Sequence, residues 1–153
     1  MQIADASELQ FEPEAWDAAL CIGASFVWGT IADAAAALVP LVREGGFVAI
    51  GEPFWRQWPL PDGIEKEDFV DLGATVERFE QAGLAATGII AASQDDWDHY
   101  ESLHWRATEE WLAEHLDHPD ADDIRARHDR YRSDYFRFQR ALLGWAIFAG
   151  RKV

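Results

Sequence analysis

Apolar residues follow two different periodicities along this chain. Short apolar runs with little alternation lie at residues 18–24, 47–51, 85–92 and 144–149. The first and third of these runs are typical of strands buried on both faces of a parallel sheet. Longer stretches between the runs repeat their apolar positions every three or four residues, as amphipathic helices do. The alternation of strand and helix predicts a single α/β domain over residues 1–153.

The segment 16–58 contains the best-defined strand, helix and strand unit. Thr30 and Asp33 have the spacing of a capping box, in which a hydroxyl and a carboxylate satisfy backbone N–H groups at the start of a helix. We expect this helix to run to about Val42, and the glycine pair at 45–46 to stop it before the next strand. Two strands connected by such a helix are expected to be parallel.

Three more helices are expected further along the chain. One spans residues 71–81 and ends before Gly83. The other two are amphipathic and cover residues 97–116 and 120–143. Together they form a helical pair inserted at 94–143, between the third strand and the last one.

The charge balance argues against a nucleic-acid partner and against an anionic membrane. The chain has 28 acidic and 13 basic residues and a formal charge of −15, which repels phosphate groups. Six arginines at 125–140 are interleaved with aromatics, but the acids among them favour a solvated helix face paired with carboxylates. We expect a soluble, cytoplasmic protein, because the longest charge-free run, 18–32, is too short for a bilayer span.

Neither a disulfide framework nor a metal site is expected. Cys21 is the only cysteine, and it lies in an apolar run where a free thiol behaves as a small hydrophobic side chain. His99 and His104 are five residues apart, so they do not share a helix face as metal ligands should.

Several segments together resemble the C-terminal part of the class I S-adenosylmethionine-dependent methyltransferases. These segments are Asp5-Ala6-Ser7, WDAALCIGAS at 16–25, LVREGGFVAIGEPFW at 41–55 and GWAIFAGRK at 144–152. The segment DDWDHYESLHWRATEEWL at 95–112 is similar to a bacterial and archaeal subgroup of small-molecule methyltransferases with helices inserted before the last strand. The resemblance implies a partial doubly wound, mostly parallel Rossmann-like sheet that lacks its first strands and has an antiparallel last strand.

The resemblance implies S-adenosylmethionine as the cofactor, although the glycine-rich loop over which this family binds it is missing from the chain. If residues 1–5 are the third strand, two strand–helix units are absent. An expressed fragment, a start codon assigned too late and a natural half-protein each explain this, and a second copy that seals the open sheet edge is a further outcome. We therefore expect the substrate-side part of a small-molecule methyltransferase, inactive alone. The alternative is a non-catalytic module used for dimerisation or partner binding.

By resemblance, two groups of residues lie at the cofactor. Asp5 and Ala6 correspond to the adenine-binding position, where a carboxylate accepts from the exocyclic amine; alternatively, Asp5 caps a turn. The second group follows the first strand at the edge that lines the cofactor cleft and consists of Ile22, Gly23, Ala24 and Ser25. Small residues there permit close backbone approach, and they equally suit a tight strand-to-helix turn.

Glu52 leaves the second strand at the same sheet edge and is a candidate general base for methyl transfer to an oxygen or nitrogen. A carboxylate at a strand end also commonly binds neighbouring backbone or an arginine. Trp55 and Trp58 follow Glu52 and are candidates for an apolar wall of the substrate pocket, where aromatic faces attract a sulfonium cation. Plain core packing is the alternative for both tryptophans.

The inserted helices concentrate aromatic and titratable side chains on helical stripes, as a lid over a substrate would. The pocket candidates are Trp97, Tyr100, Trp105 and His128. His104 lies on a similar stripe and is a candidate catalytic residue, since an antiparallel pair of helices brings it towards His128 or the cleft. A satisfied core histidine is the alternative interpretation of both histidines.

Overall fold

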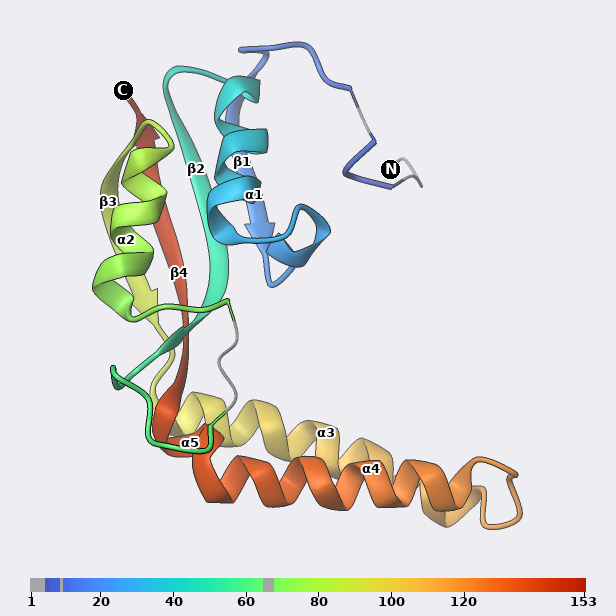
Figure 1. The fold of residues 1–153 in the computed structure, drawn as a ribbon. Helices are drawn as coiled ribbons and strands as arrows, with labels where there is room; N and C mark the ends of the chain where they lie inside the picture. Colours follow the sequence, from blue (N-terminus) through green and yellow to red (C-terminus); the bar gives the residue numbers. More distant parts are fainter. Residues whose placement is uncertain (1–4, 9, 65–67) are drawn as a thin grey trace. The chain divides into compact units, whose positions relative to one another are not determined.

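The computed structural model describes residues 5–8, 10–64 and 68–153 of the chain (Figure 1). The chain divides into two compact units: Met1–Ala91 with Trp145–Val153 form the first, and Ala92–Gly144 form the second. The first unit contains a sheet and two helices, and the second is helical. The strand predicted at residues 1–5 falls mostly outside the described residues.

Four strands form one open sheet in the order β1-β2-β4-β3. They are β1 (Trp16–Ile22), β2 (Val42–Trp55), β3 (Leu84–Ala91) and β4 (Leu143–Lys152). β1 and β2 are parallel, whereas β4 is antiparallel to β3. The predicted α/β class, the parallel first pair and the antiparallel last strand are therefore confirmed.

The first crossover helix begins where the sequence predicts and ends earlier. α1 (Ile31–Leu38) starts at a capping box, in which Thr30 Oγ1 accepts from the Asp33 N–H at 3.3 Å and Asp33 Oδ2 accepts from the Thr30 N–H at 3.0 Å. A 3-10 turn over Val39–Leu41 follows. Pro40 lies in this turn and has no N–H with which to extend the α-helical hydrogen bonds.

β2 begins at Val42, directly after the 3-10 turn, so helical structure ends close to the predicted residue. The prediction that the glycine pair stops the helix before the strand is wrong, because the pair lies inside β2. The register against β1 shifts between Val42 and Phe47, which places the glycine pair at 45–46 in a bulge inside the strand. Glycine is needed at position 46, because a Cβ there would lie 2.8 Å from the Arg43 carbonyl oxygen.

α1 and α2 (Leu72–Gln81) cover one face of the sheet (Figure 1). Asp71 caps α2 by accepting from the Ala74 N–H at 3.0 Å, and Gly83 follows the helix with a φ of +90°. The buried core joins both helices to the strands and includes Ile31, Ala34, Ala35, Val48, Ile50, Phe79 and Phe148.

The opposite face of the sheet is open in the described part of the first unit. Cys21 in β1 is 5% exposed, whereas Leu20 and Ile22 on either side of it are 70% and 46% exposed. Ile90 in β3 is 71% exposed. The prediction that these two strands are buried on both faces is therefore wrong, because α1 and α2 cover one side only.

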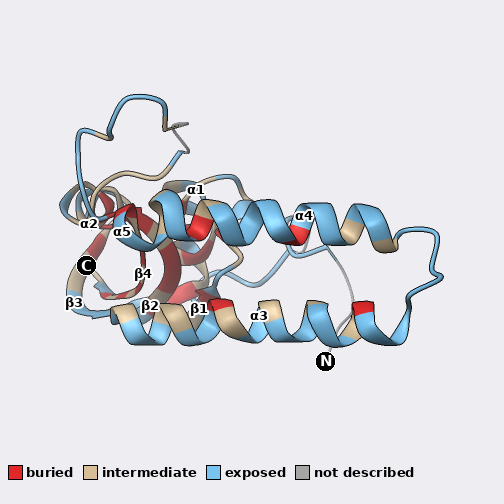
Figure 2. Ribbon diagram, turned by 90° about the horizontal axis from the view of Figure 1, so that it is seen from below, coloured by how far each residue is buried: buried red, intermediate tan, exposed pale blue. Residues whose placement is uncertain are grey.

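The second unit is an antiparallel pair of helices (Figure 2). α3 (Gln94–Glu114) starts at a capping box of Ser93 and Asp96, and α4 (Ala121–Asp134) returns alongside it. The few buried positions of the two helices lie on the sides that face each other. None of the helices in the described ranges combines the length and apolar character of a membrane span.

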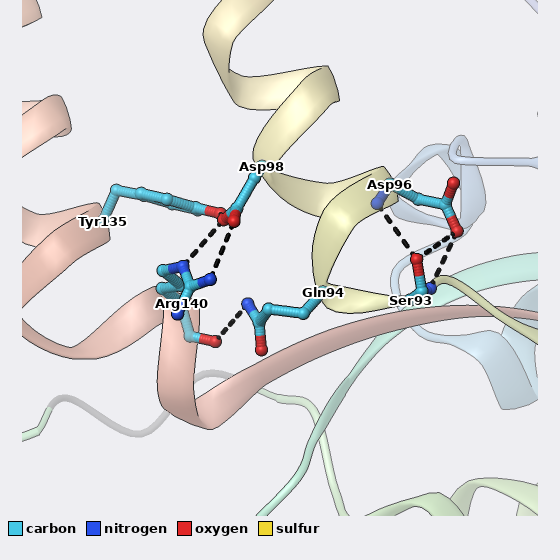
Figure 3. A network of polar contacts seen from close by, with 6 residues as sticks. All are labelled: Ser93, Gln94, Asp96, Asp98, Tyr135 and Arg140. Carbon is cyan, nitrogen blue, oxygen red and sulfur yellow. Dashed lines mark hydrogen bonds and ion pairs between the residues drawn. The ribbon is translucent and has the colours of Figure 1, made fainter.

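The helix predicted at 120–143 is not a continuous α-helix. α4 ends at Asp134, one π-helical turn covers Tyr135–Gln139, and the short α5 (Arg140–Leu142) follows. Asp98 in α3 accepts hydrogen bonds from the Tyr135 hydroxyl and from two nitrogens of Arg140, the latter at 2.8 Å each (Figure 3). These bonds connect the end of the helical pair to its beginning. The π-helical turn brings Tyr135 and Arg140 to the same side of the helix, whereas a regular α-helix would place them on different sides.

Candidate functional site

The carboxyl ends of β1 and β2 meet at one edge of the sheet, because the two strands are parallel neighbours. Ile22 is opposite Gly51, and the Gly23 N–H donates to the Gly51 carbonyl at 3.0 Å. Gly23 has a φ of +68°, which glycine adopts without strain. A 3-10 turn over Ser25–Val27 follows directly. Residues 22–25 thus form the tight strand-to-helix turn that their sequence allows.

A buried hydrogen bond joins the two strand ends. Ser25 Oγ donates to Glu52 Oε2, and both side chains are buried. Burial raises the pKa of the Glu52 carboxyl, and the hydrogen bond from Ser25 opposes part of that rise. Glu52 is therefore held by a serine, a partner that the sequence interpretation does not foresee.

The enclosed space beside Glu52 is about as large as one water molecule. This cavity of about 30 Å³ lies between Glu52, the start of α1 and residues Thr75 and Arg78 of α2. A water molecule occupies about 30 Å³ in the liquid. This cavity is therefore too small for a cofactor or a substrate.

Asp5 and Ala6 belong to a turn that precedes β1. Ser7 donates to Asp5 Oδ1 from its backbone N–H at 2.9 Å and from its hydroxyl at 2.7 Å. These hydrogen bonds lower the pKa of Asp5. The turn-capping role of Asp5 is present in the structure, and its adenine-binding role stays a prediction.

The two tryptophans after Glu52 differ in their surroundings. Trp55 is buried, and its ring lies 6.2 Å from that of Phe69, centroid to centroid. Its indole Nε1 is buried without a hydrogen-bond partner among the described residues. Trp58 is exposed and precedes a cis peptide bond to Pro59. Trp55 thus packs as core, while Trp58 lies at the surface.

The helical unit contains a much larger cavity, of about 400 Å³, between α3 and α4. Four predicted residues line it: Tyr100, His104 and Trp105 of α3 and His128 of α4. Trp97 stacks on Tyr100 with ring centroids 5.8 Å apart. The volume lies in the range of small-molecule sites, which runs from about 300 to 1,000 Å³.

Four residues outside the predicted pocket set also line this cavity. They are Thr108, Ile124, Arg127 and Tyr131. Thr108, Ile124 and Tyr131 each lie three or four residues from a predicted member on the same helix, which places them on its stripe. Arg127 is adjacent to His128 in sequence and lies three and four residues from Ile124 and Tyr131. The signal was therefore in the sequence, but it required knowing that these two stripes face each other.

Glu101 is a buried carboxyl beside the cavity that sequence reasoning also misses. Its Oε1 accepts from the Tyr131 hydroxyl at 3.3 Å, and its Oε2 has no hydrogen-bond partner among the described residues. Burial raises the pKa of Glu101. Burial and the nearby Glu101 charge also raise the pKa of Tyr131 to about 12. At neutral pH the Tyr131 hydroxyl therefore keeps the proton that it donates to Glu101.

The arginine-rich part of the chain is paired with carboxylates, as predicted, at two places. Arg125 lies 3.7 Å from Glu109, and Arg140 lies 2.8 Å from Asp98. Glu109 Oε1 is also 3.4 Å from Nε2 of His128, without hydrogen-bond geometry.

Within the described ranges, no group of three or more His, Cys, Asp or Glu side chains is arranged to hold a metal ion.

Comparison with known proteins identifies relatives by sequence. No protein-family model matches the chain. The uncharacterized protein YjhP of Escherichia coli (strain K12) is 32% identical over 143 residues, which cover 89% of this chain and 58% of YjhP. The chain thus spans less than two thirds of the length of this relative.

Solved structures match the chain over nearly its whole length. One match is an S-adenosylmethionine-dependent methyltransferase from Geobacter sulfurreducens, crystallised with S-adenosyl-L-homocysteine. It has a TM-score of 0.87 and is 30% identical in sequence, and the match covers 98% of this chain and 63% of the methyltransferase. A second one, from Thiobacillus denitrificans with the same ligand, has a TM-score of 0.86 and 29% identity, with the same coverage. The crystal structure of YjhP itself has a TM-score of 0.82 and covers 90% of this chain.

Proposed function

This chain belongs to the class I S-adenosylmethionine-dependent methyltransferase family, and on that premise we propose that it is the substrate-side part of a methyltransferase acting on a small molecule. The observation that carries the proposal is the match of 98% of the chain to a relative crystallised with S-adenosyl-L-homocysteine. That ligand is what S-adenosylmethionine becomes after it gives up its methyl group. The chain spans 63% of that relative, and we propose that catalysis also needs residues that correspond to the remaining part of it.

On the cofactor side, we assign contact to residues 22–25 and to Asp5 and Ala6. The support for the first group is its place after β1 at the carboxyl edge of the parallel pair, where ligands of doubly wound sheets bind. Gly23 has no Cβ and has a positive φ that other residues rarely adopt, so a ligand can approach the backbone closely there.

On the substrate side, we assign the cavity between α3 and α4. Trp55 and Trp58 stay candidates for an apolar wall in the first unit. The cavity has the volume of a small-molecule site and holds aromatic, hydroxyl and imidazole groups. Such a mixture of apolar walls and a few polar groups is usual for sites that orient a small ligand.

Methyl transfer breaks the bond between the sulfonium sulfur and the methyl carbon as the acceptor atom forms its bond to that carbon. An acceptor O–H or N–H must also lose a proton to a base. Glu52 and His104 are the two candidates. Burial raises the pKa of Glu52, which makes its carboxylate a better proton acceptor than an exposed glutamate.

The roles of these two residues separate in pH profiles of turnover. For a base, Glu52→Gln or His104→Gln lowers kcat about 100-fold or more and abolishes the acidic limb of the profile. A residue whose replacement leaves turnover unchanged across the pH range is removed from the mechanism.

A cofactor titration with matched glycine variants tests the proposal. Gly23 and Gly63 both have positive φ, +68° and +84°, and a Cβ at either would meet nothing within 4 Å. Alanine therefore introduces similar backbone strain at both, but only Gly23 lies at the proposed cofactor edge. We expect Gly23→Ala to weaken S-adenosyl-L-homocysteine binding in calorimetry at least tenfold more than Gly63→Ala, in the protein that includes the in-frame sequence upstream of Met1. Equal effects of the two variants would contradict the assignment.

A specific observation favours a second candidate function, a non-catalytic module that pairs with another chain. β1 is an edge strand of the described sheet, and Leu20 and Ile22 expose apolar surface on its open face. Unpaired strands of this kind join other strands readily, including those of a second copy. Light scattering distinguishes the two functions. The module is supported if the chain forms a stable oligomer, if Leu20→Lys dissociates this oligomer, and if the chain does not bind the cofactor. A stop codon immediately upstream of Met1 would point the same way.

A further inference from the structure

The cavity between α3 and α4 differs in charge from the chain around it. The whole chain carries a formal charge of −15, yet no carboxylate is among the described residues that line this cavity. Its ionisable lining consists of Arg127, His104, His128 and two tyrosines. A ligand in this cavity therefore meets hydrogen-bond donors and a permanent cation rather than acids.

Arg127 is the arginine of α4 that lines the cavity. Arg125 is paired with Glu109, and Arg132 lies over the ring of Trp105 at 5.5 Å. Arg127 has no ion-pair partner within the described ranges and lines the cavity. A guanidinium presents a planar set of N–H donors that matches the two oxygens of a carboxylate.

The remaining walls are flat and aromatic. Tyr100 and Tyr131 are both partly exposed, and with Trp105 they line the same space. Tyr100 meets the edge of His104 at a centroid distance of 4.7 Å, which holds its ring in place. Aromatic faces and edges favour a planar ring over a flexible chain of the same volume.

Two glutamates of α3 have partners on α4. Glu101 accepts from Tyr131, and burial raises its pKa, so its charge is suppressed relative to an exposed glutamate. Glu109 lies between Arg125 and His128.

We propose that this cavity binds a planar aromatic acid, with its carboxylate at Arg127 and its ring between Tyr100, Trp105 and Tyr131. The inference rests on the proposed function, for which it supplies the class of methyl acceptor. A ring hydroxyl of such a molecule can take the methyl group from the sulfonium and lose its proton to a base, whereas the carboxylate can take the methyl group with no proton to release.

Calorimetric titration of the full chain, without cofactor, tests the inference with three probes of similar shape: 2-naphthoate, the neutral 2-naphthamide and the cationic 2-naphthylmethylamine. We expect 2-naphthoate to bind most tightly. Arg127→Gln should weaken its binding about tenfold, the value of one charge-assisted hydrogen bond, and leave 2-naphthamide unchanged. Arg130→Gln is the matched control, because Arg130 is an exposed arginine of the same helix that does not line the cavity.

The aromatic part of the inference has its own variant. Tyr100→Leu replaces a half-exposed ring by an apolar side chain, so folding is retained while the flat wall is lost. It should weaken both naphthyl probes several-fold. Tighter binding of the amine, equal losses in the Arg127 and Arg130 variants, or no binding of 2-naphthoate would each overturn the inference. Because no cofactor is present, naphthoate binding that survives while S-adenosyl-L-homocysteine binding fails would refute the proposed function alone.

Discussion

Replacing Ser25 by alanine tests whether the buried bond to Glu52 stabilises the two strand ends. Both side chains are buried, and the Ser25 hydroxyl donates to Glu52 Oε2. Without that donor the ionised carboxylate loses a partner inside the protein, which costs about 1–3 kcal/mol at neutral pH. Against a total stability of about 5–15 kcal/mol for a domain, this loss is large enough to measure by urea unfolding.

The loss has a definite pH dependence. Burial raises the pKa of Glu52 in the folded chain above its ordinary value. The stability associated with the protonated carboxyl is therefore fully present below the unfolded pKa and is lost as the pH rises through the folded pKa. The Ser25 hydrogen bond lowers the pKa of Glu52 in the folded chain, so Ser25→Ala raises this pKa. The loss of stability then extends to higher pH and becomes larger.

The assay is the free energy of unfolding measured between about pH 4 and pH 8 for the wild type, Ser25→Ala and Glu52→Gln. Glu77→Gln, which neutralises an exposed carboxyl on α2, is the control for a general charge effect. We expect the Ser25→Ala penalty to grow with pH, and Glu52→Gln to flatten the profile relative to the control. A penalty that is equal at both ends of the range would refute the argument from a buried charge.

Three further predictions concern the elements that support the candidate sites. Thr30→Ala should destabilise the chain by about 1 kcal/mol in urea unfolding, through the lost cap of α1, and Thr30→Ser should restore most of it. Gly150→Ala should cost about 1–3 kcal/mol, because its Cβ would lie 2.4 Å from Phe79 Cε1, while Gly88→Ala has open space and serves as the control; equal costs would contradict this packing. The hydrogen bonds of Asp98 with Arg140 and then Tyr135 lower the pKa of Asp98, so their contribution is present above the unfolded pKa and is lost as the pH falls through the folded one. Asp98→Asn should remove that pH dependence from the helical circular dichroism signal, and an unchanged acid transition would contradict it.

Local chemistry explains why much of the fold was predictable. The capping box of Thr30 and Asp33, the cap at Asp71 and the glycine after α2 each act within a few residues, so the sequence contains both partners. The end of α1 was less predictable, because pairing of Val42 with β1 competes with continuation of the helix. That competition is between elements distant in sequence, and the strand pairing prevails.

The candidate sites show the same division. Residues 22–25 and Glu52 were identified from their places at strand ends, but the bond from Ser25 to Glu52 depends on parallel pairing in register. Tyr100, Trp105 and His128 were identified from helical stripes, whereas Arg127 and Glu101 acquire their meaning only from the helix opposite. A stripe indicates which side of a helix is buried, not which groups it meets.

The sequence by itself determined the order of the elements, the α/β class, the helix starts and the resemblance to methyltransferases, because these depend on periodicity, short-range capping and the residues themselves. Only the tertiary structure decided that one face of the sheet is open at Leu20 and Ile90, that Glu52 is held by Ser25, and that a cationic, aromatic cavity lies between α3 and α4. Burial, pKa and cavity lining are properties of groups brought together from distant positions. The interaction energies of these groups depend on the exclusion of water from between them.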